Sequence, residues 1–193
     1  MEEDMQSATK KVALVTGANK GMSMTNSIRK SVRRIGSTLI AATLEVHIAA
    51  AEAPVFDFVA AEDVLPKVLT GYGLLPGVVR TSGNTGPWDQ PGSARTVHLA
   101  DGSTAREQVT AYEQPVYFAY RTSDYTFALR YLANSAEGQW WFKKDGSGTQ
   151  VRWTYTFRGK NWLASIPLAL FVQTQWVGYM RTCLRNVERQ FRS

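Results

Sequence analysis

The pattern of apolar and polar residues along the chain predicts a sheet followed by one long helix. Residues 43–48 alternate between apolar and polar, which is the period of a half-buried strand. Two short helical stretches, 53–60 and 61–70, come next, with Pro54 in the first helical turn. Runs of β-branched and aromatic residues then predict a meander of antiparallel strands. These strands are expected at residues 75–81, 95–99, 104–113, 116–123, 126–133, 139–144 and 149–158.

The C-terminal part of the chain predicts a single helix of about 26 residues that ends at Arg192. Ser165 is expected to cap its N-terminus, and Pro167 lies in the first turn, where a missing N–H costs nothing. Two apolar stripes follow this helix at steps near 3.6 residues. The surplus apolar side, at Leu168, Val172 and Trp176, favours a homodimer contact or a gate to a cavity. The stripes begin with Ile166, Leu170 and Val177 and with Leu168, Val172 and Trp176.

The stretch 161–180 carries no charge and is long enough to cross a bilayer as a helix. Five of its polar side chains would be costly in lipid, and we therefore interpret it as a buried helix of a soluble protein. Those side chains are Asn161, Ser165, Gln173, Thr174 and Gln175.

The turn after residue 99 determines which side chains of two strands face one another. Asp101-Gly102 is typical of a hairpin. A three-residue loop, 100–102, with Gly102 in the left-handed conformation keeps the apolar residues of both strands on one face. This register places Arg95 directly opposite Glu107 on the concave side of the sheet. The sequence therefore predicts a partly buried ion pair between them.

Two roles are open for this pair. It can belong to the scaffold alone, because a charge that faces a cavity needs a partner. Alternatively, Arg95 binds a carboxylate, phenolate or enolate of a ligand, and Glu107 acts as a general base with a pKa raised by desolvation. Arg95 and Glu107 are therefore the candidate catalytic residues.

Composition and charge exclude several classes of protein. The 193 residues suit one domain, and 44% hydrophobic with 11% aromatic residues excludes a disordered chain. A lone cysteine, Cys183, excludes an internal disulfide and a cysteine-based zinc site, and it fits a cytoplasmic protein. With only two histidines, no metal site and no cofactor are expected. The net charge of +6 comes without a nucleic-acid-binding motif, so nucleic acid is not an expected partner.

The N-terminal residues differ from the remainder. Residues 11–21 resemble the first strand and glycine loop of short-chain dehydrogenases, but Ser23 stands where the last glycine belongs and no Tyr-x-x-x-Lys follows. We therefore expect residues 1–23 to be a flexible leader or tag-like segment rather than part of a dehydrogenase. Residues 24–40 contain four basic residues and no acid, and an amphipathic helix is possible there. A solvated basic arm is the favoured interpretation, followed by a ligand-binding domain over 41–193.

Several motifs resemble the START-like superfamily, with the polyketide cyclase/dehydratase-like proteins as the most similar branch. They are Pro-Gly-Ser-Ala-Arg-Thr-Val at 91–97, Leu-Ala-Asp-Gly at 99–102, Arg-Glu-Gln-Val at 106–109, Tyr-Glu-Gln-Pro-Val-Tyr-Phe-Ala-Tyr-Arg at 112–121 and Gly-Thr-Gln-Val-Arg-Trp-Thr-Tyr-Thr-Phe at 148–157. The similarity covers about residues 40–192. It implies an α+β helix-grip fold, in which a curved antiparallel sheet of six to seven strands wraps around the C-terminal helix.

A single helix cannot fill the concavity of such a sheet, so a cavity lined by aromatic side chains is expected to remain. The same aromatic side chains can instead pack as a solid core. The candidate ligand-binding residues are Tyr120, Leu129, Tyr131, Trp140, Phe142, Trp153, Tyr155, Phe157, Leu170 and Val177.

Three functions remain open at this point. The first is a carrier or binding protein for a hydrophobic or aromatic small molecule. The second, implied by the resemblance, is a cyclase/dehydratase-type enzyme that acts as a lyase or isomerase. The third is a membrane-associated lipid or quinone chaperone, whose basic arm makes weak contact with a membrane surface.

Overall fold

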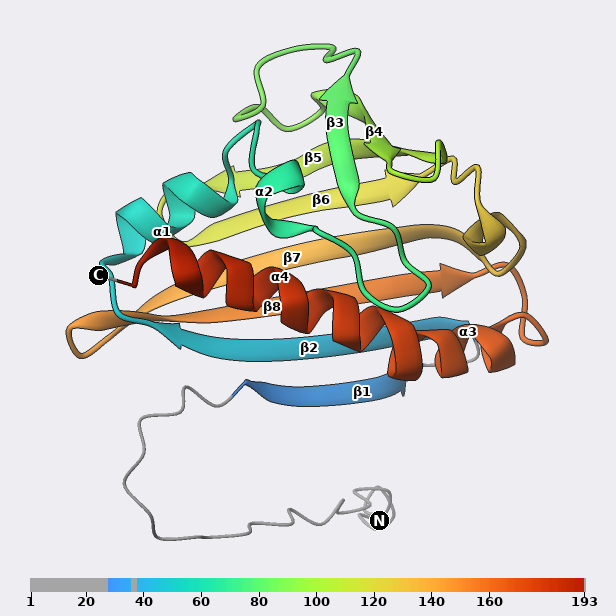
Figure 1. The fold of residues 1–193 in the computed structure, drawn as a ribbon. Helices are drawn as coiled ribbons and strands as arrows, with labels where there is room; N and C mark the ends of the chain where they lie inside the picture. The colour runs from blue at the N-terminus through green and yellow to red at the C-terminus, as the bar shows by residue number, and fades with distance from the viewer. Residues whose placement is uncertain (1–27, 36–37, 193) are drawn as a thin grey trace, which may run out of the picture.

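An eight-stranded antiparallel sheet curves around one long C-terminal helix in the computed structural model, which describes residues 28–35 and 38–192 (Figure 1). The strands are β1 (Arg29–Ile35), β2 (Leu39–Ile48), β3 (Val78–Ser82), β4 (Ala94–Leu99), β5 (Thr104–Glu113), β6 (Tyr117–Ser123), β7 (Ala133–Asp145) and β8 (Gly148–Gly159). Their order across the sheet is β1-β2-β8-β7-β6-β5-β4-β3. The expected α+β helix-grip fold is confirmed, with one strand more than the six to seven expected.

The helices lie on the concave side of the sheet and between its two ends. They are α1 (Glu52–Val59), α2 (Leu65–Val68), α3 (Ser165–Phe171) and α4 (Val177–Gln190), with a 3₁₀ turn at Ala128–Tyr131 and a π-helical turn at Val172–Trp176. The two predicted short helices are present, but the second is only one turn long. Pro66 occupies its first turn, and the backbone leaves the helical conformation at Leu69.

The period of two in the sequence explains the central strands. In β2 and β8 the residues of one parity are buried, and those of the other, except Ala41 and Gly148, are wholly or partly exposed. Leu44 pairs with Trp153 and Val46 with Val151, so that the buried sides of the two strands share one face. This face covers the C-terminal helix, and the core lies between the two layers.

Part of the predicted basic arm is a strand. Arg29–Ile35 pairs along its whole length with β2, so the interpretations of this stretch as a free arm or as a helix are wrong. Arg29, Lys30 and Arg33 are exposed, whereas Val32 packs against the core. Cationic side chains are common on edge strands, where they discourage pairing with other chains. The proposed leader, residues 1–23, lies outside the described residues.

The chain between β6 and β7 forms a turn where the sequence predicts a strand over 126–133. Asp124 adopts a left-handed conformation, with φ of 51°, and ends β6. Residues 128–131 then form the 3₁₀ turn, in which Leu129 is buried. Strand β7 begins at Ala133, six residues before the predicted start. The sequence contains no signal for a strand at these residues, because Ala136 and Gly138 lack the β-branched or aromatic side chains that are typical of strands.

The C-terminal helix is continuous, but it contains an extra residue in the π-helical turn. Ser165 does not cap it; its hydroxyl instead donates a hydrogen bond to the carbonyl oxygen of Asn161 at 2.8 Å. Along the buried side the residues follow one another in steps of four, five, three and four, and the step of five spans the π-helical turn. These residues are Leu168, Val172, Val177, Met180 and Leu184.

The inserted residue turns the two halves of the helix relative to each other. The predicted stripes follow a constant period of 3.6, so they connect the wrong residues across this turn. Ile166 and Leu170 are exposed, although Val177 from the same stripe is buried. Leu168 and Val172 face the core, so they do not form the expected dimer contact. No helix among residues 28–35 and 38–192 is both long and apolar enough to cross a bilayer.

Candidate functional site

A cavity lies between the concave face of the sheet, the C-terminal helix and the segment that connects α2 to β3. The centres of water-sized molecules can occupy about 80 Å³ of it. Its wall is formed by Leu65, Leu69, Leu75, Pro76, Val78, Val97, Leu99, Ala105, Glu107, Tyr120, Thr122, Tyr125, Phe127, Leu129, Trp153, Tyr155, Trp176 and Tyr179. None of these lining residues is basic, and Glu107 is the one with a carboxyl group.

A glycine in β7 makes room for the aromatic part of this wall. Gly138 pairs with Tyr120 of β6 on one side and with Tyr155 of β8 on the other. A Cβ atom at residue 138 would lie 2.3 Å from Cζ of Tyr120, so the Tyr120 ring occupies the space above the glycine. The two tyrosine rings thereby approach to 6.3 Å between centroids. The absence of a side chain at residue 138 therefore determines where Tyr120 lies.

We expect Gly138→Ala to lower the free energy of unfolding by about 1–3 kcal/mol, as overpacking does in other cores. This result would reverse the usual preference of a strand for alanine over glycine. Urea denaturation of the wild type, Gly138→Ala, Tyr120→Leu and the double variant measures it. In the Tyr120→Leu background the alanine should cost little, and an equal cost in both backgrounds would rule out the clash.

The hydroxyl groups of three residues that line the cavity are joined by hydrogen bonds. The Thr122 hydroxyl lies 2.8 Å from the Tyr125 hydroxyl and 2.7 Å from that of Tyr155. Tyr125 also donates to the carbonyl oxygen of Thr122 at 3.1 Å. Burial raises the pKa of Tyr125 and of Tyr155 well above the usual range of a tyrosine. Both side chains are therefore neutral hydrogen-bonding groups near neutral pH.

The predicted ion pair is present and more deeply buried than expected. Gly102 has φ of 83°, and the Leu99 N–H donates to the Ser103 carbonyl, as the three-residue loop requires. Arg95 pairs with Glu107 across β4 and β5, and its Nε donates to Oε2 of Glu107 at 2.8 Å. Their side chains are only 1% and 4% exposed.

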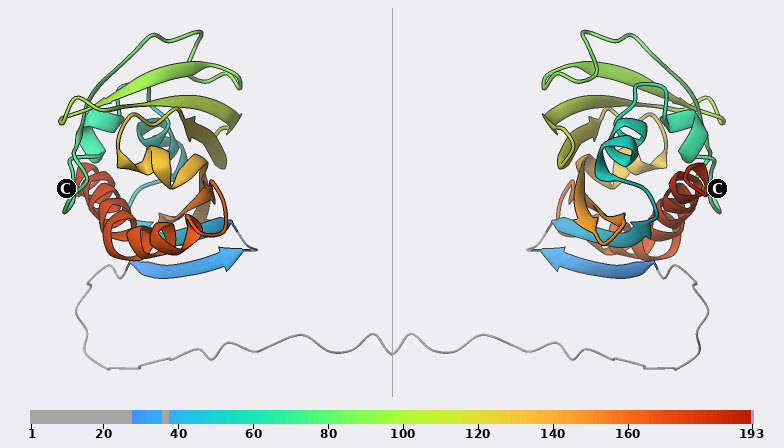
Figure 2. Two further views of the ribbon diagram at one scale, coloured as in Figure 1. Left: turned by 90° about the vertical axis from the view of Figure 1, so that its right-hand side faces the viewer. Right: turned by 90° about the vertical axis from the view of Figure 1, so that its left-hand side faces the viewer.

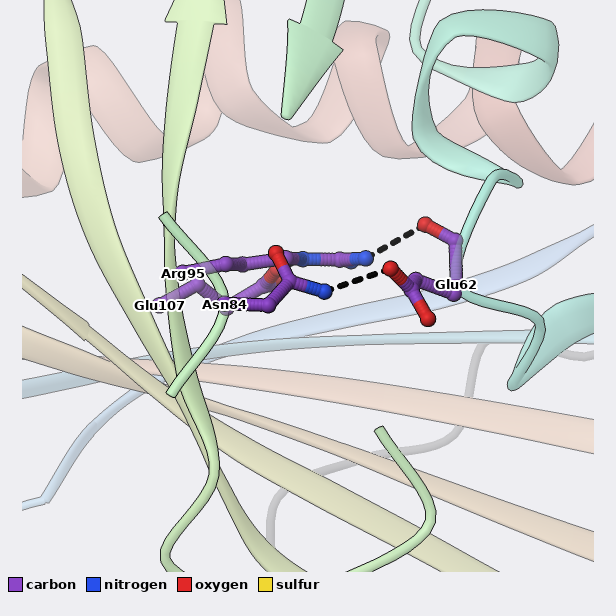
Figure 3. Close-up of polar contacts among 4 residues, drawn as sticks. All are labelled: Glu62, Asn84, Arg95 and Glu107. Carbon is purple, nitrogen blue, oxygen red and sulfur yellow. Dashed lines mark hydrogen bonds and ion pairs between the residues drawn. The ribbon is translucent and has the colours of Figure 1, made fainter. Parts of the chain in front are cut away.

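Arg95 is held on three sides, and Figure 3 shows the hydrogen bond that links it to Glu62 on one of them. Besides Glu107, it donates from Nη1 to the carbonyl oxygen of Glu62, and its guanidinium lies 3.6 Å from the ring centroid of Trp88. The Glu62 carboxylate in turn accepts a hydrogen bond from Nδ2 of Asn84. Arg95 does not line the cavity, whereas Glu107 does. The arginine therefore lies behind Glu107, which fits the scaffold role better than the alternative in which Arg95 contacts a ligand.

Glu107 is the titratable group best placed for chemistry in the cavity. Burial raises the pKa of its carboxyl above the usual range, and the attraction of Arg95 offsets only part of this effect. A carboxyl with a raised pKa can exchange a proton with a bound molecule closer to neutral pH than an ordinary glutamate. The part of the chain that the structure describes holds no cluster of histidine, cysteine and acidic side chains suited to a metal ion.

The structure divides the predicted ligand-binding residues into three groups. Those that line the cavity are Tyr120, Leu129, Trp153 and Tyr155. Those that pack in the surrounding core are Trp140, Phe142, Phe157 and Val177. The remaining two, Tyr131 and Leu170, are each 63% exposed at the surface, so their predicted place in the cavity wall is wrong. The unexpected 3₁₀ turn exposes Tyr131, and the π-helical turn exposes Leu170.

Other lining residues were not expected from the sequence. Leu69, Leu75 and Pro76 come from the connection between α2 and β3, which docks on the helix through a hydrogen bond of 3.3 Å from the Tyr179 hydroxyl to the Pro76 carbonyl. Phe127 comes from the turn before β7, and Trp176 from the π-helical turn. Gly71 and Gly73 indicate a turn in the connection between α2 and β3. No periodicity in any of these segments assigns their side chains to the cavity.

The family model for "Polyketide cyclase / dehydrase and lipid transport" matches residues 40–192. This chain belongs to that family. No protein of curated function matches it in sequence. The match covers all the residues that line the cavity, and β1 lies outside it.

Solved structures share the fold at low sequence identity. Ara h 8.0201 is 16% identical with a TM-score of 0.64, and the alignment covers 79% of this chain and 97% of that one. The di-domain ARO/CYC BexL from the BE-7585A biosynthetic pathway is 18% identical with a TM-score of 0.61, covering 81% and 51%. Ms6760 from Mycobacterium smegmatis is 16% identical with a TM-score of 0.58, covering 86% and 98%. At these identities the likeness concerns the fold alone.

Proposed function

We propose that the protein binds a neutral, hydrophobic or aromatic small molecule in the cavity between the sheet and the C-terminal helix. The observation that carries this proposal is the composition of the wall, in which apolar and aromatic side chains surround one buried carboxyl, that of Glu107. Apolar walls with few polar groups are typical of small-molecule sites. The family, which includes lipid-transport proteins by its description, supports the same role.

The ligand has to widen the cavity as it enters. The accessible 80 Å³ is well below the volume of about 300 Å³ at which sites for drug-sized ligands begin. The connection from Thr70 to Gly77 is a wall segment outside the named helices and strands, tied to the C-terminal helix by hydrogen bonds from Leu74 to Gln175 and from Tyr179 to Pro76. Gly71 and Gly73 have left-handed backbones with φ of 104° and 55°, and Leu74 at its tip is exposed. We infer that this connection opens when a ligand binds.

Val97→Phe tests the proposal. Val97 lines the cavity from β4, so a phenyl ring there should fill the space and weaken binding of the neutral fluorescent dye N-phenyl-1-naphthylamine by about tenfold or more. The matched control is Val79→Phe, because Val79 is an exposed valine of the neighbouring strand β3. Fluorescence titration measures both variants and the wild type. No binding to the wild type, or equal loss in both variants, would refute binding in this cavity.

A second function, a cyclase/dehydratase-type enzyme, is supported by the same carboxyl. Glu107 reaches the cavity with a raised pKa, which suits a general base, and Arg95 holds it from behind. In this function Glu107 removes a proton from the carbon next to a ligand carbonyl, and the electron pair of that C–H bond moves into an enolate. Loss of turnover in Glu107→Gln, with ligand binding retained, distinguishes the enzyme from a carrier.

A further inference from the structure

Exposed apolar side chains gather where the C-terminal helix begins. We call Tyr131, Trp162, Leu163, Ile166 and Leu170 the apolar end; each of them is between 57% and 63% exposed. Ile166 and Leu170 are four residues apart and share one side of α3, and Leu163 lies in the turn that leads into it. The view in the left half of Figure 2 faces this part of the molecule, with the 3₁₀ turn beside α3.

The hydrogen bonding of the chain brings these residues together from two segments. The Lys160 N–H donates to the Leu132 carbonyl at 2.9 Å, which ties the approach to α3 to the residue that follows Tyr131. Ala133 pairs with Gly159 at the ends of β7 and β8. Because the π-helical turn directs Leu168 and Val172 inward, Ile166 and Leu170 necessarily face outward. The apolar end therefore does not contribute to the core of the fold.

The charges next to α3 are positive, and the connection that carries Tyr131, residues 124–132, holds one acid, Asp124. The sequence contains no aspartate or glutamate from Gly146 to Val187. Lys160 is exposed in the segment that leads to α3, and the Arg130 guanidinium lies 4.6 Å from the ring centroid of Tyr131. Apolar side chains bordered by tryptophan, tyrosine and basic residues match the boundary between the acyl chains and the headgroups of an anionic bilayer.

We propose that the apolar end docks on the surface of an anionic lipid bilayer. Trp162, Leu163, Ile166 and Leu170 enter the headgroup boundary, and the nearby basic residues bind lipid phosphates or carboxylates. This docking goes beyond ligand binding and does not require the cavity to be occupied. It does place the cavity near the membrane, since Phe127 and Leu129 line the cavity just before Tyr131 and Trp176 lines it from the same helix as Leu170.

Flotation of the full chain with lipid vesicles tests the docking. We expect binding to phosphatidylcholine vesicles with about 30% phosphatidylserine to exceed binding to pure phosphatidylcholine vesicles by about tenfold. The triple variant Leu163→Ser, Ile166→Ser, Leu170→Ser should lose about tenfold or more of this affinity. The three side chains are exposed, so the variant should unfold at nearly the wild-type temperature. The matched control is Val79→Ser with Val116→Ser, which removes exposed apolar side chains elsewhere.

A charge variant and the oligomeric state complete the experiment. Arg130→Gln with Lys160→Gln should weaken binding to the phosphatidylserine vesicles and leave the weak binding to pure phosphatidylcholine unchanged. The proposal is overturned if the wild type does not float with anionic vesicles, or if the triple variant floats as well as the wild type. It is also overturned if light scattering shows a wild-type dimer that the triple variant converts to a monomer, because a second copy then covers the apolar end. The triple variant should still bind the dye in its cavity. A loss of vesicle binding with dye binding retained concerns the apolar end, whereas a loss of dye binding concerns the proposed function.

Discussion

Arg95→Met should lower the free energy of unfolding by about 3–5 kcal/mol, the usual cost of leaving one member of a buried ion pair alone. The substitution removes the partner of Glu107 and the donor to the Glu62 carbonyl, and it also removes the guanidinium from the Trp88 ring. Glu107 cannot turn to water, because its side chain is only 4% exposed. Urea denaturation monitored by tryptophan fluorescence measures the loss.

The double variant Arg95→Met with Glu107→Leu is the matched control for that result. It replaces both charges by apolar side chains of similar size, so most of the lost stability should return. The difference between the sum of the single effects and the double effect gives the coupling between the two residues. A cost of less than about 1 kcal/mol for Arg95→Met would contradict the assigned role of the pair. So would a double variant as unstable as the sum of the two single variants.

Glu107→Gln should lower general-base catalysis in the cavity by about 100-fold or more. The amide keeps an oxygen that can accept from Nε of Arg95, but it cannot take up a proton. The measurement is the exchange of the hydrogen atoms next to the carbonyl of 1-indanone for deuterium, followed by nuclear magnetic resonance in the presence of the protein. This small aryl ketone has the apolar body and the carbonyl group that the cavity and Glu107 require together.

Dye binding serves as the control for this variant, since Glu107→Gln should retain it if the cavity keeps its shape. Exchange that is no faster with wild-type protein than in buffer would argue against the enzyme and leave the carrier. Equal exchange in the wild type and in Glu107→Gln would remove Glu107 as the base. Binding of the dye together with a large loss of exchange would favour the enzyme.

The position of the ion pair follows from the sequence because two local rules act together. A strand places alternate residues on one face, and the length of the hairpin loop fixes the register between its strands. The left-handed conformation of Gly102 fixes the loop at three residues, and this register alone places Arg95 opposite Glu107. Their complete burial did not follow, since it depends on Trp88, in the irregular loop before β4, and on Glu62, 33 residues from Arg95.

The errors at Leu170 and Tyr131 have a common origin. Periodicity predicts burial only while the backbone keeps one geometry, and both residues lie next to a change of geometry. One extra residue in the π-helical turn moves Leu170 to the outside, and the 3₁₀ turn does the same for Tyr131. The sequence carries no strong signal for either change. For the same reason, the lining residues Leu75 and Pro76 could not be assigned, because they lie on an irregular connection whose position depends on tertiary contacts.

Strand β1 has a consequence for the behaviour of the protein at high concentration. The family match begins at residue 40, so Arg29–Ile35 lies outside it, and this strand occupies the hydrogen-bonding side of β2 that faces away from β8. The sheet consequently ends in a ribbon that bears Arg29, Lys30 and Arg33 exposed to solvent. Two molecules that approach through this border bring like charges together. Strand β1 thus disfavours the edge-to-edge association of sheets from different molecules.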